Sequence, residues 1–255
     1  MNVYVSLTTI KQNEAIVVET LQSVAAQAQL PDKCFVFLSE TPYLFDRGFT
    51  NRNVGSQLSG FMESNPLFEL RWCENTGPFR KLLPLLEEKF DEHCLIITID
   101  DDTVYTPTLV EKIVGDFTRY KCCSSNWALT LSHPGDLRGL NYENFARPIS
   151  NYLYNFHLGK GGVAYHPSFF HKTRNIMFDY DLIKRTCPTN DDVWFNFMRI
   201  ANGISCHSDN LPYMTKDNTN QETALWWNLN ARDRTNSKYM RATVDLLISE
   251  GLLTE

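Results

Sequence analysis

The sequence lacks several features that define other classes of protein. It contains no run of about 18 uninterrupted apolar residues, so it predicts no integral membrane segment. Basic residues are outnumbered, with 24 Lys and Arg against 30 Asp and Glu, and they form no cluster. Because binding to a nucleic-acid backbone needs a basic face, the net charge of -6 argues against nucleic acid as the main partner.

Cysteine motifs are missing as well. The seven cysteines are odd in number and include no C-x-x-C spacing, which argues against both a disulfide framework and a zinc ribbon. The amino terminus enters a strand-like pattern at residues 3–5 without a basic segment and an apolar signal core. We therefore expect a cytoplasmic protein. Its 255 residues suffice for one large α/β core, and we expect a single domain.

Short apolar runs alternate with amphipathic segments along the first half of the chain. Residues 3–7 and 34–38 predict strands, and Val17, Leu21 and Val24 recur between them at helical spacing. Such a βαβ unit indicates a mostly parallel sheet. Further on, the sequence predicts a helix opened by Thr106 and Pro107, an irregular aromatic region over residues 137–155, and an amphipathic helix over residues 237–247 that docks onto the core.

The most informative segment is the apolar run of residues 95–99, which ends in three consecutive acids, Asp100, Asp101 and Asp102. The run is typical of a buried parallel strand, and its carboxyl end is where open α/β sheets place their ligands. Three unpaired carboxylates repel one another strongly unless a cation lies among them. Since hard oxygen ligands suit Mn²⁺ or Mg²⁺, the sequence predicts a divalent metal that arrives with substrate phosphates.

The spacing of these acids also bears on two other motifs, the EF-hand and a phosphatase motif. An EF-hand needs Gly at its sixth position and Glu at its twelfth, where this chain has Tyr105 and Glu111. Asp100, Asp102 and Val104 do fit the D-x-D-x-[TV] string of haloacid-dehalogenase-type phosphatases. That family usually carries its nucleophile on the first strand, whereas two βα units precede Asp100 here. A phosphatase that uses Asp100 therefore stays as an alternative.

A second pair of acids, Asp191 and Asp192, begins a predicted helix over residues 191–200, with Asn190 as the candidate N-cap. Acids in a first turn stabilise a helix by about 0.3–1 kcal/mol, which is one explanation of the pair. The other is chemical, because a helix amino terminus keeps a carboxylate ionised and thus able to act as a general base.

Further candidates are Arg80 and Lys81, in the predicted first turn of a helix, where cations are unfavourable unless they face an anion. Gly161 and Gly162 would let a sugar or phosphate approach the backbone closely. His207 follows a strand-like segment and is a candidate metal ligand. For each of these the structural alternative remains open, namely a solvated side chain, a tight turn or a core histidine.

Five segments in order, residues 5–10, 75–82, 100–102, 161–163 and 188–195, resemble a group of GT-A glycosyltransferases of surface-polysaccharide assembly, which are family-2-like. The resemblance spans residues 3 to about 230. It implies a Rossmann-like α/β fold with a mostly parallel sheet flanked by helices, a smaller acceptor-side β region and a C-terminal helix. Residues 1–120 would form the nucleotide-sugar-binding half, and residues 121–255 the acceptor-binding half.

The same resemblance implies a transferase that moves a sugar from a nucleotide-diphosphate sugar, by default a UDP-sugar, to a glycan or glycolipid acceptor. The base and ribose would be lined by Thr8, Thr9, Ile10, Ser39 and Glu40, with Arg80 and Lys81 at the nucleotide or its phosphates. Asp100 would face the ribose and Asp102 would hold Mn²⁺ or Mg²⁺. Asp192 or Asp191 would deprotonate the acceptor, giving inversion.

Retention stays open, because GT-A enzymes of both outcomes share the metal motif. A protein that binds a nucleotide sugar without turnover is a further alternative. The motifs carry no prediction of oligomeric state.

Overall fold

The computed structural model of the protein describes residues 1–254. An eight-stranded mixed sheet lies at its centre, in the order β3-β2-β1-β4-β11-β6-β12-β9. Four neighbouring strands of this sheet are parallel: β3 (Phe68–Trp72), β2 (Lys33–Leu38), β1 (Asn2–Thr8) and β4 (Cys94–Thr98). All five residues of β4 are buried, as expected of an apolar run covered on both faces.

The other half of the sheet is mainly antiparallel and contains β11 (Val163–Tyr165), β6 (Cys123–Ser125), β12 (Cys206–His207) and β9 (Asn151–Tyr152). Two small sheets accompany it. One joins β7 (Ala128–Leu131), β10 (Asn155–His157) and β8 (Phe145–Ala146), and the other joins β5 (Thr103–Tyr105) to β13 (Met214–Asp217). The expected α/β fold, with a mostly parallel sheet and a smaller β region, is confirmed.

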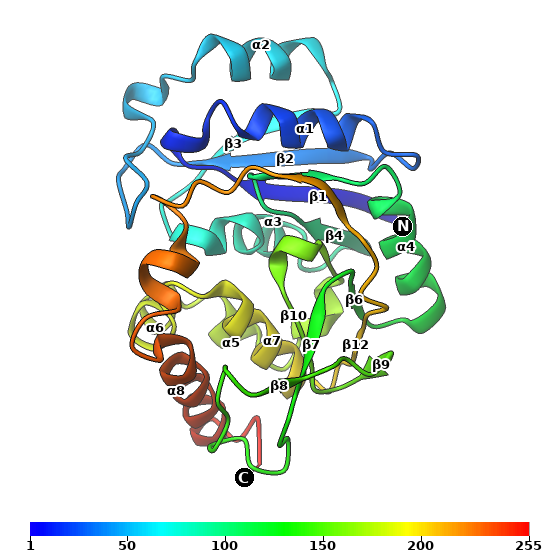
Figure 1. The fold of residues 1–255 in the computed structure, drawn as a ribbon, viewed down its shortest axis with the longest axis vertical. Coiled ribbons are helices and arrows are strands. Elements are labelled where there is room, and N and C mark those ends of the chain that lie inside the picture. The colour runs from blue at the N-terminus through cyan, green and yellow to red at the C-terminus, as the bar shows by residue number, and fades with distance from the viewer. Residues whose placement is uncertain (255) are drawn as a thin grey trace.

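The helices are α1 (Val17–Ala25), α2 (Ser56–Ser64), α3 (Leu83–Glu88), α4 (Leu109–Tyr120), α5 (Arg174–Met177), α6 (Tyr180–Thr186), α7 (Asp191–Ala201) and α8 (Thr235–Ser249). Figure 1 shows α1 and α2 at one end of the molecule and α8 at the other. Met240, Val244 and Leu247 of α8 are fully buried, and α8 packs against α7. The predicted docking of this amphipathic helix is confirmed.

The predicted start of α4 is wrong by two residues, because the helix begins at Leu109 and Thr106 is not its cap. Tertiary contacts hold Thr106 outside the helix: its N–H donates to the Tyr213 carbonyl at 3.0 Å, and its carbonyl accepts from Gln27 Nε2 at 2.8 Å. Within residues 1–254, no helix combines the length and the apolar character that crossing a membrane requires.

Candidate functional site

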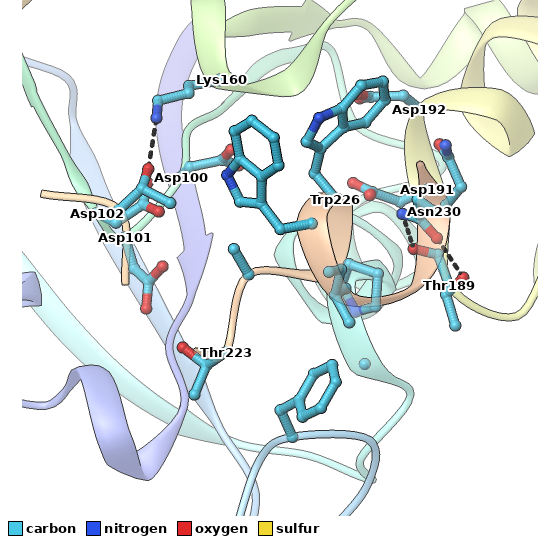
Figure 2. A pocket seen from close by; sticks show the side chains of 18 of the residues that line it. Asp100, Asp101, Asp102, Lys160, Thr189, Asp191, Asp192, Thr223, Trp226 and Asn230 are labelled. Carbon is cyan, nitrogen blue, oxygen red and sulfur yellow. Dashed lines mark hydrogen bonds between the residues drawn. The ribbon is translucent and has the colours of Figure 1, made fainter. Parts of the chain in front are cut away.

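A cavity of about 1190 Å³ lies at the carboxyl ends of β1 and β4 (Figure 2). The amino terminus of α7 and a π-helical turn at Trp226–Asn230 form its other walls. Nine of the residues singled out from the sequence line it: Thr8, Ile10, Arg80, Lys81, Asp100, Asp101, Asp102, Asp191 and Asp192. The fold therefore brings the acid triplet (Asp100, Asp101 and Asp102) and the acid pair (Asp191 and Asp192) to one place.

Within the acid triplet, Asp101 is committed to the protein itself. Its Oδ2 accepts from Thr9 Oγ1 at 2.5 Å and from Asn13 Nδ2 at 3.2 Å, while its carbonyl accepts from Thr20 Oγ1 at 2.9 Å. Burial, together with the charge of Asp102, raises the pKa of Asp101 to about 7. Asp101 and Thr9 thus fasten the acid turn to the segment that begins α1.

Asp102 is held beside the segment that follows β13. The Asn218 N–H donates to the Asp102 carbonyl at 2.8 Å, and Lys160 Nζ donates to Asp217 Oδ1 at 2.8 Å and to Thr219 Oγ1 at 2.6 Å. Burial and the charge of Asp100 raise the pKa of the Asp102 carboxyl, and Lys160 opposes that shift. Two crowded carboxylates of this kind, Asp100 and Asp102, fit the oxygen ligands that Mn²⁺ or Mg²⁺ prefers.

Lys81 joins the acid triplet to the acid pair. Its Nζ lies 2.6 Å from Asp100 Oδ1 and 3.1 Å from Asp191 Oδ2, and its side chain is only 10% exposed. Burial alone would lower the pKa of Lys81, but the charges of Asp100, Asp191 and Asp192 raise it well above its usual value. The chain therefore supplies a cation of its own to these crowded acids.

The predicted helical position of Arg80 and Lys81 is also corrected. They end a 3₁₀ turn, Gly77–Lys81, that precedes α3, and Gly77 adopts a φ of +66° at its start. In this turn Arg80 is 1% exposed, donates from Nε to the Gly77 carbonyl at 3.1 Å and pairs with Asp46 Oδ2 at 3.0 Å. Over residues 1–254, its buried Nη1 finds no hydrogen-bond partner. Arg80 lines the cavity, and one of its buried donors has no partner among the described residues.

Asn190 caps α7 as predicted, since its side chain accepts from the Val193 N–H at 2.9 Å. This cap places Asp191 and Asp192 in the first turn. Asp191 is buried, while Asp192 is half-buried and accepts from the Gly159 N–H through Oδ1 at 2.9 Å. Burial and the charge of Asp191 raise the pKa of Asp192 well above its usual value.

The glycine that the site requires is Gly159, rather than the pair that the sequence suggested. A Cβ at Gly159 would lie 2.9 Å from Asp192 Oδ1 and 3.3 Å from Lys81 Nζ. A Cβ at Gly161 would instead meet Trp127 at 2.6 Å, and Gly162, with a φ of +74°, faces Leu109 and Ile113. Neither Gly161 nor Gly162 is among the described residues that line the cavity, so packing accounts for both.

Ser39, Glu40 and His207 are likewise absent from the described lining. Ser39 Oγ donates to the Cys73 carbonyl at 2.9 Å, and Glu40 pairs with Arg52 at 2.7 Å on the surface. His207 lies on β12 and does not join Asp100 and Asp102. It forms a separate group with Asp116 and Asp209 that could hold a metal ion.

Sequence reasoning missed the aromatic wall. Trp226 is 45% exposed and projects into the space that holds both groups of acids (Figure 2). Its ring centroid lies 5.9 Å from that of Tyr142, which belongs to the irregular region expected on the acceptor side. Below it, Asn230 accepts from Thr189 Oγ1 at 2.6 Å and returns a hydrogen bond to the Thr189 carbonyl at 3.0 Å. The sequence did contain a signal for this wall, namely two adjacent tryptophans in a polar segment.

No protein-family model and no curated protein matches the chain, but crystal structures do. S. aureus TarS 1-349 in complex with UDP shares 14% identity over 98% of this chain and 72% of that chain, with a TM-score of 0.54. The same protein in complex with UDP-GlcNAc shares 13% identity over 98% and 73%, with a TM-score of 0.50. In a further TarS 1-349 structure the identity is 16% over 84% of this chain, with a TM-score of 0.53.

The chain spans 60% of that further TarS 1-349 structure and 36% of a longer TarS structure. At such low identity the likeness concerns the fold alone. It shows that the chain adopts the GT-A fold of TarS, as the sequence motifs implied.

Proposed function

We propose that the protein transfers a sugar from a nucleotide-diphosphate sugar, a UDP-sugar, to a hydroxyl of a glycan or glycolipid acceptor. The observation that carries this proposal is the joining of two acid groups across one cavity by Lys81, with Asp100 on one side and Asp191 on the other. A donor site and a base beside it are what such a transfer needs. The TarS complexes with UDP and UDP-GlcNAc support the choice of donor.

In this proposal residues 1–120 hold the donor. Thr8 and Ile10 at the end of β1 contact the nucleotide, and Arg80 offers its unused Nη1 to the nucleotide or its phosphates. Arg80 is rigidly placed by Asp46, so little side-chain entropy is lost when it binds. A buried guanidinium with one free donor is well suited to an anionic ligand.

Asp100 and Asp102 would hold Mn²⁺ or Mg²⁺ at the diphosphate. When bound, the ion would supply positive charge against the charge that grows on the leaving group. Lys81 and Lys160 flank the same place, and both ammonium groups reduce the repulsion among the carboxylates. These two lysines orient Asp100 and the segment beside Asp102 before any ligand arrives.

Residues 121–255 would receive the acceptor, with Asp192 as the general base and inversion as the outcome. Asp191 is buried and engaged by Lys81, whereas Asp192 is half-buried and more open to an acceptor. The raised pKa of Asp192 runs against the expectation that the helix amino terminus keeps it ionised, so it must lose its proton before it can act as the base. The Gly159 N–H fixes Asp192 Oδ1, which leaves Oδ2 for the acceptor hydroxyl. Trp226 and Tyr142 provide flat apolar faces on which a sugar ring can stack.

The test is turnover of UDP-hexoses with pooled glycan acceptors, measured as UDP release. Asp192→Asn keeps the shape of the side chain, so we expect it to bind UDP normally and to lose about 10²–10⁴-fold in turnover. Glu143→Gln is the matched control, since Glu143 is an exposed carboxylate on the wall of the same cavity.

Other outcomes separate the alternatives. Equal loss of turnover in Glu143→Gln would contradict the assignment of the base. Binding of UDP without turnover by the wild type would favour a non-catalytic binder. Release of inorganic phosphate that depends on Asp100, with trapping by fluoride analogues, would favour the phosphatase.

A further inference from the structure

We propose that Asp116, His207 and Asp209 bind a divalent transition-metal ion of the zinc type, at a second site outside the catalytic cavity. Asp116 lies on α4, His207 on β12, and Asp209 two residues further along the chain. One ligand atom from each lies within 4.8 Å of the others. None of the three is among the described residues lining the large cavity, so this site is distinct from the one proposed for the donor.

The imidazole of His207 is the first sign of a ligand. Its side chain is 1% exposed, and within residues 1–254 its Nε2 is buried without a hydrogen-bond partner. That atom faces two carboxylates, at 3.4 Å from Asp209 Oδ2 and 3.7 Å from Asp116 Oδ1. Buried polar atoms without partners are rare in folded proteins. When Nε2 carries no proton, its lone pair faces two anions, an arrangement that a cation between them would stabilise.

The other side of the ring is arranged as it is in metal-binding histidines. His207 Nδ1 lies 3.3 Å from Ser150 Oγ, and the ring stacks on Tyr120 with centroids 4.0 Å apart. In the tautomer whose Nδ1–H donates to Ser150, Nε2 carries the lone pair that a metal needs. A contact of this kind at the second nitrogen fixes the tautomer and the orientation of a ligating imidazole.

The two carboxylates already surround a cation. Lys112 Nζ lies 2.5 Å from Asp116 Oδ2 and 3.1 Å from Asp209 Oδ2. The Lys112 side chain is 25% exposed, so its ammonium can turn to solvent when a metal enters. A cavity of about 380 Å³, lined in part by Lys112, Asp116, Leu211 and Pro212, adjoins one of the three proposed ligands. Lys112 is therefore a competitor for the site rather than a ligand.

The donor set decides the class of ion. One imidazole and two carboxylates suit zinc and its first-row neighbours, with water completing the coordination. The segment after Asp209 leads into β13, which pairs with β5. Asp217 of β13 accepts a hydrogen bond from Lys160, whose charge acts on Asp102. An ion here would fasten α4 to the start of that segment, so its expected effect is on stability.

The test is calorimetric titration with Zn²⁺ and absorption spectroscopy with Co²⁺, on Asp102→Asn and on three further variants made in that background. Asp102→Asn is the parent because it weakens the other proposed metal site. In this background one ion should still bind. Asp209→Asn and His207→Gln should each weaken that binding at least tenfold. Asp209 is 44% exposed, so its variant tests the site even if His207→Gln fails to fold.

Lys112→Met gives the sharpest contrast. If the ammonium competes with the metal, this variant should bind Zn²⁺ more tightly than the parent; a pure ion-pair network would show no such gain. The Co²⁺ spectrum should lack the intense thiolate band, which separates this site from the neighbouring Cys206. Unchanged binding in Asp209→Asn, no gain in Lys112→Met, or a thiolate band would each overturn the proposal.

Discussion

Replacing Lys81 tests how the site is held together. Lys81→Met keeps the apolar stem but leaves Asp100 and Asp191 without the ammonium that lies 2.6 and 3.1 Å from them. The Asp100 side chain is 27% exposed and that of Asp191 12%, so water screens them poorly. Removing one partner from a buried ion pair typically costs about 3–5 kcal/mol, and we expect a loss of this size in the free energy of unfolding at pH 7.5.

Lys89→Met is the matched control for this measurement. Lys89 Nζ also lies near two carboxylates, at 3.2 Å from Glu88 and 3.0 Å from Glu92, but these are 42% and 46% exposed. Exposed pairs contribute less than about 1 kcal/mol. Urea unfolding followed by circular dichroism measures both variants at pH 7.5 and pH 5.

The stability loss of Lys81→Met should depend on pH in a definite direction. Burial raises the pKa of Asp191 above its value in the unfolded chain and Lys81 opposes that shift, so the pKa of Asp191 should rise further without the ammonium. Protonation of Asp191 therefore stabilises the fold at low pH, and this contribution disappears as the pH rises. The deficit of Lys81→Met should thus be smaller at pH 5 than at pH 7.5. A loss no greater than that of Lys89→Met, or a deficit that grows as the pH falls, would refute the reasoning.

Three further predictions concern neighbouring positions. The pKa of Asp101 is raised from 3.8 to about 7 by burial, so the unliganded protein should lose stability as the pH rises between these values; Asp101→Asn should flatten that dependence in thermal melts. Gly159→Ala brings a Cβ within 2.9 Å of Asp192 and should lower turnover, whereas Gly115→Ala, in open space on α4, should stabilise the fold by about 0.5–1 kcal/mol in urea unfolding. Trp226→Ala should raise the KM for the acceptor without changing UDP binding by calorimetry, and the opposite pattern would contradict an acceptor role.

Local patterns predicted part of this molecule correctly. The apolar run before Asp100 forms the fully buried strand β4. Asn190 caps α7, and its side chain accepts from the N–H of the residue three positions further along. Both depend on neighbours in the sequence, namely a run of core residues and a cap with its first turn. The order of motifs was enough to predict the GT-A fold that the TarS structures show.

Contacts between distant segments were not predictable in the same way. The pairing of Lys81 with both Asp100 and Asp191 depends on the sheet and α7 meeting, which no local spacing encodes. Similarly, the choice of Gly161 over Gly159 followed from a cluster of glycines, whereas the requirement comes from Asp192 across the fold. His207 was a candidate metal ligand because it follows a strand-like segment, but its partners Asp116 and Asp209 come from the fold and could not be read from that segment.

The most direct test of the central claim is a calorimetric titration with UDP, GDP, CDP and dTDP, with and without Mn²⁺, on the wild type and on Asp102→Asn. We predict that UDP binds best, that Mn²⁺ strengthens its binding at least tenfold, and that the variant loses this gain. Absence of binding by all four nucleotides, or UDP binding that is equal with and without Mn²⁺ and in the variant, would contradict the account.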